Sequence, residues 1–185
     1  MIALGSDHGG YALKQHIIEY LDAHGLDYRD FGCHSTESCD YPVFAKAAAE
    51  AVASGECERG IVICTTGIGI SIAANKVQGV RCALCTDPLM AEMTRRHNDA
   101  NMLALGAGIV GPNLAEAIVE TFLTTEFEGG RHARRVGLIT AMEQYPSGAR
   151  TAWLSGPRFL FTPPVWRRYT ACRFRPPPRG KNRTC

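Results

Sequence analysis

Short apolar runs alternate with amphipathic segments along the first 145 residues of the chain. The apolar runs are rich in Ile, Val, Leu and Ala, and turn-forming or polar residues bound them, which is typical of buried strands. A helical period is absent from these runs. They predict strands at residues 2–4, 26–30, 60–63, 80–85 and 102–105.

The segments between these runs carry helical spacing or helix-start signals. Leu13, Ile17 and Leu21 would share one face of a helix over residues 12–21, and Gly25 would stop it. An alanine-rich helix follows Pro42, because proline is favoured in the first helical turn. Further helices are predicted at residues 72–76, from residue 87, over 112–123 and from residue 131.

Strand and helix in regular alternation predict an α/β fold. The expected architecture is a Rossmann-like three-layer sandwich in which helices cover both faces of a five-stranded parallel sheet. Residues 1–145 would form this unit. Ligands of such sheets bind beyond the carboxyl ends of the strands, so polar residues that follow a strand are the first functional candidates.

The most informative of these positions is Cys64, directly behind the predicted strand at 60–63. Gly67 and Gly69 follow it and lead into a helix opening at 72–76, so backbone N–H groups and the helix field would form an anion cradle. The same field would favour a thiolate, which can act as a base or nucleophile. The alternative is a structural cysteine that ends a core strand.

Other polar residues fall into two groups. Asp7 and His8 follow the first predicted strand and would lie with Cys64 and Thr66 on one edge of the sheet. His97 falls in a predicted turn between a helix and a strand, which would place it on the opposite edge or against a partner subunit; the alternative is a surface cap. Arg131 and Arg135, one helical turn apart, suit a phosphate, unless they are simply solvated.

Charge divides the chain in a way that its net charge of +2 hides. Residues 146–185 hold eight Arg, one Lys, seven Pro and no acidic residue, so residues 1–145 have a net charge of −7. We therefore expect two parts, a globular domain at 1–145 and a disordered Pro/Arg-rich tail at 146–185. Aromatic residues among the arginines could stack on single-stranded nucleic acid, but a tail without function is the favoured interpretation.

Among the eight cysteines the CxxC spacing occurs once, at Cys82 and Cys85, which lie within a strand-like run. With no second pair to complete a ligand set, the cysteines favour a reduced compartment and disfavour a zinc site. No apolar stretch reaches membrane-spanning length, and the N-terminus already has the pattern of a strand rather than of a secretory signal. We therefore expect a cytoplasmic protein without a metal, a cofactor or a membrane partner.

Five separated motifs, in order and in register over residues 1 to about 144, resemble the type B ribose-5-phosphate isomerases, a family that also contains the two-subunit galactose-6-phosphate isomerase. The longest runs fourteen residues from Ile63 to Lys76. The motifs are Asp7-His8-Gly9-Gly10, Asp40-Tyr41-Pro42, Ile63-Cys64-Thr65-Thr66-Gly67-Ile68-Gly69-Ile70-Ser71-Ile72-Ala73-Ala74-Asn75-Lys76, His97-Asn98-Asp99-Ala100-Asn101 and Gly129-Gly130-Arg131-His132.

The resemblance implies a metal-free aldose–ketose isomerisation through an enediolate, in which ribose 5-phosphate and ribulose 5-phosphate interconvert in the pentose phosphate pathway. Cys64 would be the base, Thr66 would move protons between oxygens, and His97 would open the sugar ring as an acid. The residues implied to bind the substrate are Asp7, His8, Tyr41, Thr65, Gly67, Ile68, Gly69, Ser71, Asn98, Arg131 and Arg135.

The resemblance also implies a homodimer or homotetramer in which His97 and Asn98 complete the pocket of the neighbouring subunit. Family members usually carry an arginine where this chain has Gly108, and that arginine reaches the substrate phosphate. The glycine leaves the preferred sugar open. Alternatives are an isomerase of galactose, allose or tetrose phosphate, or a sugar-phosphate-binding module without catalysis.

Overall fold

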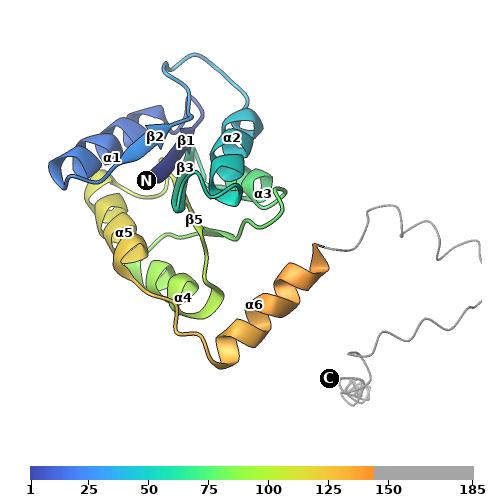
Figure 1. The fold of residues 1–185 in the computed structure, drawn as a ribbon. Helices are drawn as coiled ribbons and strands as arrows, with labels where there is room; N and C mark the ends of the chain where they lie inside the picture. The colour runs from blue at the N-terminus through green and yellow to red at the C-terminus, as the bar shows by residue number, and fades with distance from the viewer. Residues whose placement is uncertain (144–185) are drawn as a thin grey trace, which may run out of the picture. The chain divides into compact units, whose positions relative to one another are not determined.

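A computed structural model describes residues 1–143, and in it a five-stranded parallel sheet lies between two layers of helices (Figure 1). The strand order is β2-β1-β3-β5-β4. Every pair of neighbouring strands is parallel, and the central register sets Cys64 opposite Gly106. The elements are β1 (Ile2–Ser6), α1 (Tyr11–Ala23), β2 (Tyr28–Asp30), α2 (Tyr41–Ala53), β3 (Arg59–Cys64), α3 (Ile68–Ala74), β4 (Cys82–Leu84), α4 (Pro88–Asn98), β5 (Met102–Gly106), α5 (Pro112–Thr124) and α6 (Arg131–Met142).

Successive side chains of the buried strands point to opposite faces of the sheet, which divides the hydrophobic core into two halves. In β3, Ile61 and Ile63 pack with α1 and α5, whereas Val62 and Cys64 pack with α2 and α3. A fully apolar strand therefore needs helices on both sides. The consequence for the site is that the Cys64 side chain lies on the α2–α3 face of the sheet.

The helices other than α3 begin close to the predicted residues. Leu13, Ile17 and Leu21 of α1 are buried. Pro88 occupies the first turn of α4, and the Asp87 side chain accepts a hydrogen bond from the N–H of Met90 at 3.0 Å, which caps that helix. The predicted parallel α/β fold is thus confirmed for the described residues. The tail at 146–185 lies outside them.

Three local predictions were wrong. The helix after Cys64 begins at Ile68, four residues earlier than predicted, because Gly67 turns the chain sharply. The strand predicted at 80–85 is limited to Cys82–Leu84, since the Arg81 N–H is taken by the Asn101 side chain. His97 and Asn98 belong to the last turn of α4 rather than to a loop, and the turn begins only at Asp99.

A side chain bonds the outward backbone groups at the start of the edge strand β4. Asn75, which caps the C-terminus of α3, donates to the Cys82 carbonyl at 2.8 Å and accepts from the Cys82 N–H at 2.9 Å. The side-chain amide therefore bonds as a neighbouring strand would.

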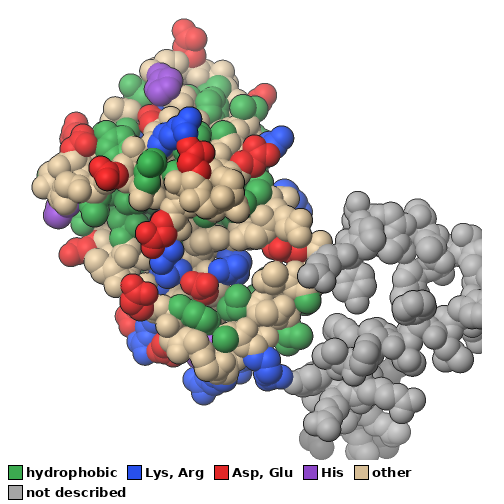
Figure 2. Space-filling view, in the orientation of Figure 1, with side chains coloured by type: hydrophobic (Ala, Val, Ile, Leu, Met, Phe, Trp, Pro, Cys, Tyr) green, Lys and Arg blue, Asp and Glu red, His purple; other side chains and the backbone are tan. Residues whose placement is uncertain are grey.

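Acidic and basic side chains are interspersed over the face shown in Figure 2, with no large field of one sign. Within residues 1–143, the helices are too short or too polar to cross a membrane.

Candidate active site

The end of β3 carries a thiol that its own loop faces with a backbone donor. Cys64 is 5% exposed, and its Sγ accepts a hydrogen bond from the N–H of Gly67 at 3.1 Å. Gly67 has a φ of +75°, and a Cβ there would lie 2.5 Å from Leu84 Cδ1, so both backbone and space require glycine. An N–H donor on sulfur stabilises negative charge there.

Two backbone N–H groups of the loop already donate hydrogen bonds to side chains of the same loop. Thr66 Oγ1 accepts from the Ile68 N–H at 3.3 Å, just as Cys64 accepts from Gly67. An enediolate would therefore take over these two donors or use the remaining N–H groups of residues 65–69. Thr65 has no positive φ, so its side chain does not strain the loop.

Asp7 and His8 lie beside this loop, at the same edge of the sheet. A Cβ on Gly9 would come within 2.2 Å of Thr65 Oγ1, which shows how closely the two loops pack. Asp7 is buried and its Oδ1 accepts from the Gly10 N–H at 3.0 Å. His8 Nδ1 accepts from the Cys39 N–H at 3.1 Å, so the neutral ring carries its proton on Nε2.

Tyr41 packs against the cysteine loop, whereas Ser71 stabilises the helix that follows it. The Tyr41 ring covers Gly69 so closely that a Cβ there would lie 2.7 Å from Tyr41 Cζ. Gly69 is thus needed for clearance; its φ is not positive, so the backbone itself does not require glycine there. The Ser71 hydroxyl donates to the Ile68 carbonyl at 2.8 Å and so holds the first turn of α3.

His97 and Asn98 lie at the other end of the sheet. They end α4, and the chain then enters β5 at Met102, whereas Cys64 is paired with Gly106 at the far end of that strand. The five residues of β5 span about 13 Å at roughly 3.3 Å per residue. Within one chain, the predicted base and the predicted acid therefore lie at opposite edges.

Two arginines fix the turn that follows His97. Arg81 Nε donates to the Asn98 carbonyl at 3.1 Å, and buried Arg95 donates to Asp99 Oδ1 at 3.0 Å and to the Ala100 carbonyl at 2.6 Å. Asp99 adopts a left-handed φ of 46° that these contacts stabilise. The C-terminal end of α4, and with it His97, is thus firmly placed.

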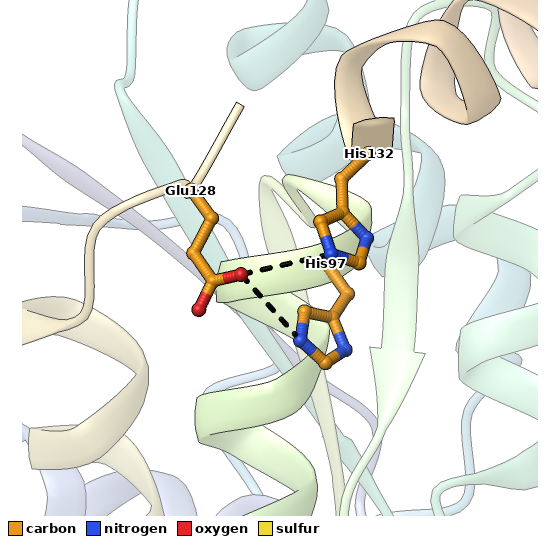
Figure 3. Close-up of side chains that lie close together, drawn as sticks. All are labelled: His97, Glu128 and His132. Carbon is orange, nitrogen blue, oxygen red and sulfur yellow. Dashed lines mark ion pairs between the residues drawn. The ribbon is translucent and has the colours of Figure 1, made fainter. Parts of the chain in front are cut away.

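His97 lies in a cluster that the sequence analysis did not identify (Figure 3). Its ring stacks on that of His132, with centroids 4.2 Å apart and planes at 2°. Glu128 Oε2 lies 3.8 Å from His97 Nε2 and 3.6 Å from His132 Nε2. Glu128 and His132 are four residues apart, but His97 is 31 residues before Glu128, so local spacing gave no signal for the cluster.

Neighbouring arginines determine the charge of this cluster. Arg96 Nε donates to Glu128 Oε1 at 2.6 Å, and this hydrogen bond is the main reason that the pKa of Glu128 is lowered. Arg131 Nε donates to His132 Nε2 at 3.2 Å. Burial first, and then His97 and Arg131, lower the pKa of His132, which favours its neutral form.

These cations argue against a metal ion between the three side chains. Their ligand atoms lie within 4.8 Å of one another, as a small metal site would require. A divalent ion there would, however, face Arg96 and Arg131 directly, and Arg131 already donates to the His132 nitrogen. We therefore interpret the cluster as an ion-pair network. Arg131 and Arg135 are exposed, in the first two turns of α6.

Gly108 lies beside a cleft of about 390 Å³ that Gly9, Thr65 and Pro112 help to line. Its N–H donates to the Thr65 carbonyl at 2.9 Å, so residue 108 borders the cysteine loop. A Cβ there would lie 3.1 Å from that carbonyl oxygen, and therefore a larger side chain requires only a small adjustment.

Comparison with known proteins gives consistent matches. The family model described as ribose/galactose isomerase matches residues 2–139. Ribose-5-phosphate isomerase B of Escherichia coli is 50% identical over 143 residues, which cover 77% of this chain and 96% of that protein. D-erythrulose-4-phosphate isomerase of Pectobacterium atrosepticum is 43% identical, covering 75% and 91%. The structure of Clostridium thermocellum ribose-5-phosphate isomerase B is 60% identical, covers 77% of this chain and 97% of that one, and has a TM-score of 0.77.

Proposed function

The chain belongs to the ribose/galactose isomerase family and is an aldose–ketose isomerase, and from this premise we propose that it interconverts ribose 5-phosphate and ribulose 5-phosphate. The observation that carries the proposal is Cys64, a thiol at the carboxyl end of a central strand with the Gly67 N–H on its sulfur. A cytoplasmic location would suit this reaction.

In the proposed reaction, the Cys64 thiolate removes the proton from C2 of the open-chain aldose. The C–H electrons form the C1=C2 double bond, and the negative charge moves to O1, where N–H groups of the cradle stabilise it. Thr66 passes the proton of the O2 hydroxyl to O1, and the thiol returns its proton to C1. Asp7 and His8 hold the sugar hydroxyls from the neighbouring loop.

Because His97 and Asn98 lie at the opposite edge from Cys64, we propose that they act in the pocket of a second copy of the chain. His97 would open the furanose ring there, Asn98 would orient the sugar, and Arg131 with Arg135 would bind the phosphate. The active unit is then a homodimer, or a homotetramer built from such dimers.

A substrate panel tests the proposal. The purified full chain is assayed with ribose 5-phosphate, erythrose 4-phosphate, allose 6-phosphate and galactose 6-phosphate, and we expect the highest kcat/KM with ribose 5-phosphate. The Cys64→Ala variant should lose the activity, whereas Cys57→Ala, which alters another buried cysteine, should retain it. A kcat/KM at least tenfold higher with another sugar phosphate would make that sugar the substrate in place of ribose 5-phosphate. Absence of turnover with all four compounds would favour a sugar-phosphate-binding module without catalysis.

A further inference from the structure

The His97–Glu128–His132 cluster contains two side chains to which the proposed reaction gives no role. The question is which histidine carries a proton. Two stacked imidazolium rings would repel each other at 4.2 Å, so the pair carries one positive charge most readily. Glu128 faces both rings through the same oxygen, Oε2, and its negative charge supports a single proton on the pair.

The surroundings disfavour a proton on His132. His132 is buried, and Arg131 donates to its Nε2, so this nitrogen presents a lone pair rather than a proton. Arg135 adds a further positive charge from α6. His97 is about one-third exposed and has Glu128 at its Nε2, which leaves Nδ1 for a ligand.

Glu128 is itself held in place from α4. The Arg96 side chain makes two contacts to Glu128 Oε1, one of them at 2.6 Å. The Glu128 N–H also donates to the Arg96 carbonyl at 3.1 Å, so both backbone and side chain are fixed. The other oxygen of the carboxylate is thereby directed at the two rings, as Figure 3 shows. Arg96 also pairs with Glu92 at 2.6 Å on the opposite side.

We propose that Glu128 is a positioning residue for ring opening, because its carboxylate holds a protonated His97 ready to act as an acid. The inference rests on the proposed function. In the step, His97 gives its proton to the ring oxygen O4 as the C1–O4 bond breaks and its electron pair goes to O4. The anomeric hydroxyl releases its proton to water, and its O–H electrons complete the C1 carbonyl. Water then restores the proton of His97.

The two directions of the reaction separate this role from a structural one. Ribose 5-phosphate is mainly a furanose and must be opened. Ribulose 5-phosphate is acyclic because its O5 carries the phosphate, and the open aldose formed from it can leave the enzyme and close in water. A defect confined to ring opening therefore slows the first direction and spares the second.

The test compares Glu128→Gln with the matched control Glu92→Gln, which removes the other carboxylate of Arg96. We expect Glu128→Gln to lower kcat with ribose 5-phosphate at least tenfold and with ribulose 5-phosphate less than twofold. The basic limb of its pH–rate profile should move to lower pH, because His97 loses the charge that favours its proton. Glu128→Asp should restore part of both effects, and Glu92→Gln should behave as wild type.

Equal losses in both directions, or an unmoved basic limb, would overturn the role of Glu128. If Glu128→Gln does not fold, the same comparison is made with Glu128→Asp, and a wild-type ratio of the two directions would then overturn it. Absence of turnover of ribose 5-phosphate by the wild-type chain would instead refute the proposed function, so the two failures are distinguishable.

Discussion

The separation of Cys64 and His97 predicts that two inactive variants restore activity to one another. His97 precedes the start of β5 and Cys64 is paired with its last residue, so the length of that strand, about 13 Å, separates them, and we expect them to meet between subunits. Cys64→Ala and His97→Ala should each be close to inactive, since one lacks the proposed base and the other the proposed acid. After the two variants are unfolded together and refolded, subunits pair at random, and each pocket takes Cys64 from one subunit and His97 from the other. Roughly a quarter of the pockets are then intact, so the mixture should recover about 25% of wild-type turnover per chain.

A second mixture provides the control and works in the opposite direction. The double variant Cys64→Ala/His97→Ala, mixed in equal amount with wild type, should have half of the wild-type activity before exchange and about a quarter after it. The assay follows the turnover of ribose 5-phosphate, with differently tagged chains to verify hybrids. If both residues act within one chain, the first mixture stays inactive and the second stays at half. Either result would refute the shared pocket.

Three further predictions follow from the geometry. Gly108→Arg should lower KM for the phosphorylated substrate, since a charge-assisted contact contributes about 1.5–3 kcal/mol and residue 108 needs only a small adjustment; an unchanged or raised KM would contradict this. Gly10→Ala should lower the free energy of unfolding in urea by about 3 kcal/mol, because its Cβ would lie 2.3 Å from the Ile63 carbonyl oxygen. Gly137→Ala, where a Cβ meets no atom within 4 Å, should not destabilise the protein. Equal effects of the two substitutions would count against the packing argument. Because the pKa of His132 is lowered in the folded protein, the unfolded chain takes up that proton at a higher pH than the folded protein does. The free energy of unfolding should therefore decrease as pH falls below 6.5, and it should decrease less in the His132→Gln variant. Parallel pH dependences of the two proteins would show that His132 is not responsible.

Local patterns were sufficient to predict most of the fold. Helical spacing placed Leu13, Ile17 and Leu21 on the buried face of α1, and the prolines marked the first turns of α4 and α5. The length of β4 was not predictable, because it depends on an Asn101 side chain that reaches Arg81 from 20 residues away.

The candidate site likewise has a part that the sequence predicts and a part that only the structure reveals. Cys64 and its glycine loop are contiguous in sequence, so a strand followed by glycines was enough to find them. Glu128 and His132 were missed because their partners His97 and Arg96 are about thirty residues away, and only packing of α6 against α4 brings them together. The role of Gly69 also required the structure, since the Tyr41 ring comes from another helix.

The Asn75 contact at the edge strand β4 bears on how copies of this chain can associate. A strand with unsatisfied outward N–H and C=O groups invites a second sheet to continue it, which yields either a shared intersubunit sheet or uncontrolled growth of strands. At Cys82 both outward groups are bonded to the Asn75 amide, so that route is blocked at this position. Contact between copies at this part of β4 would then use side-chain surfaces rather than a continued sheet.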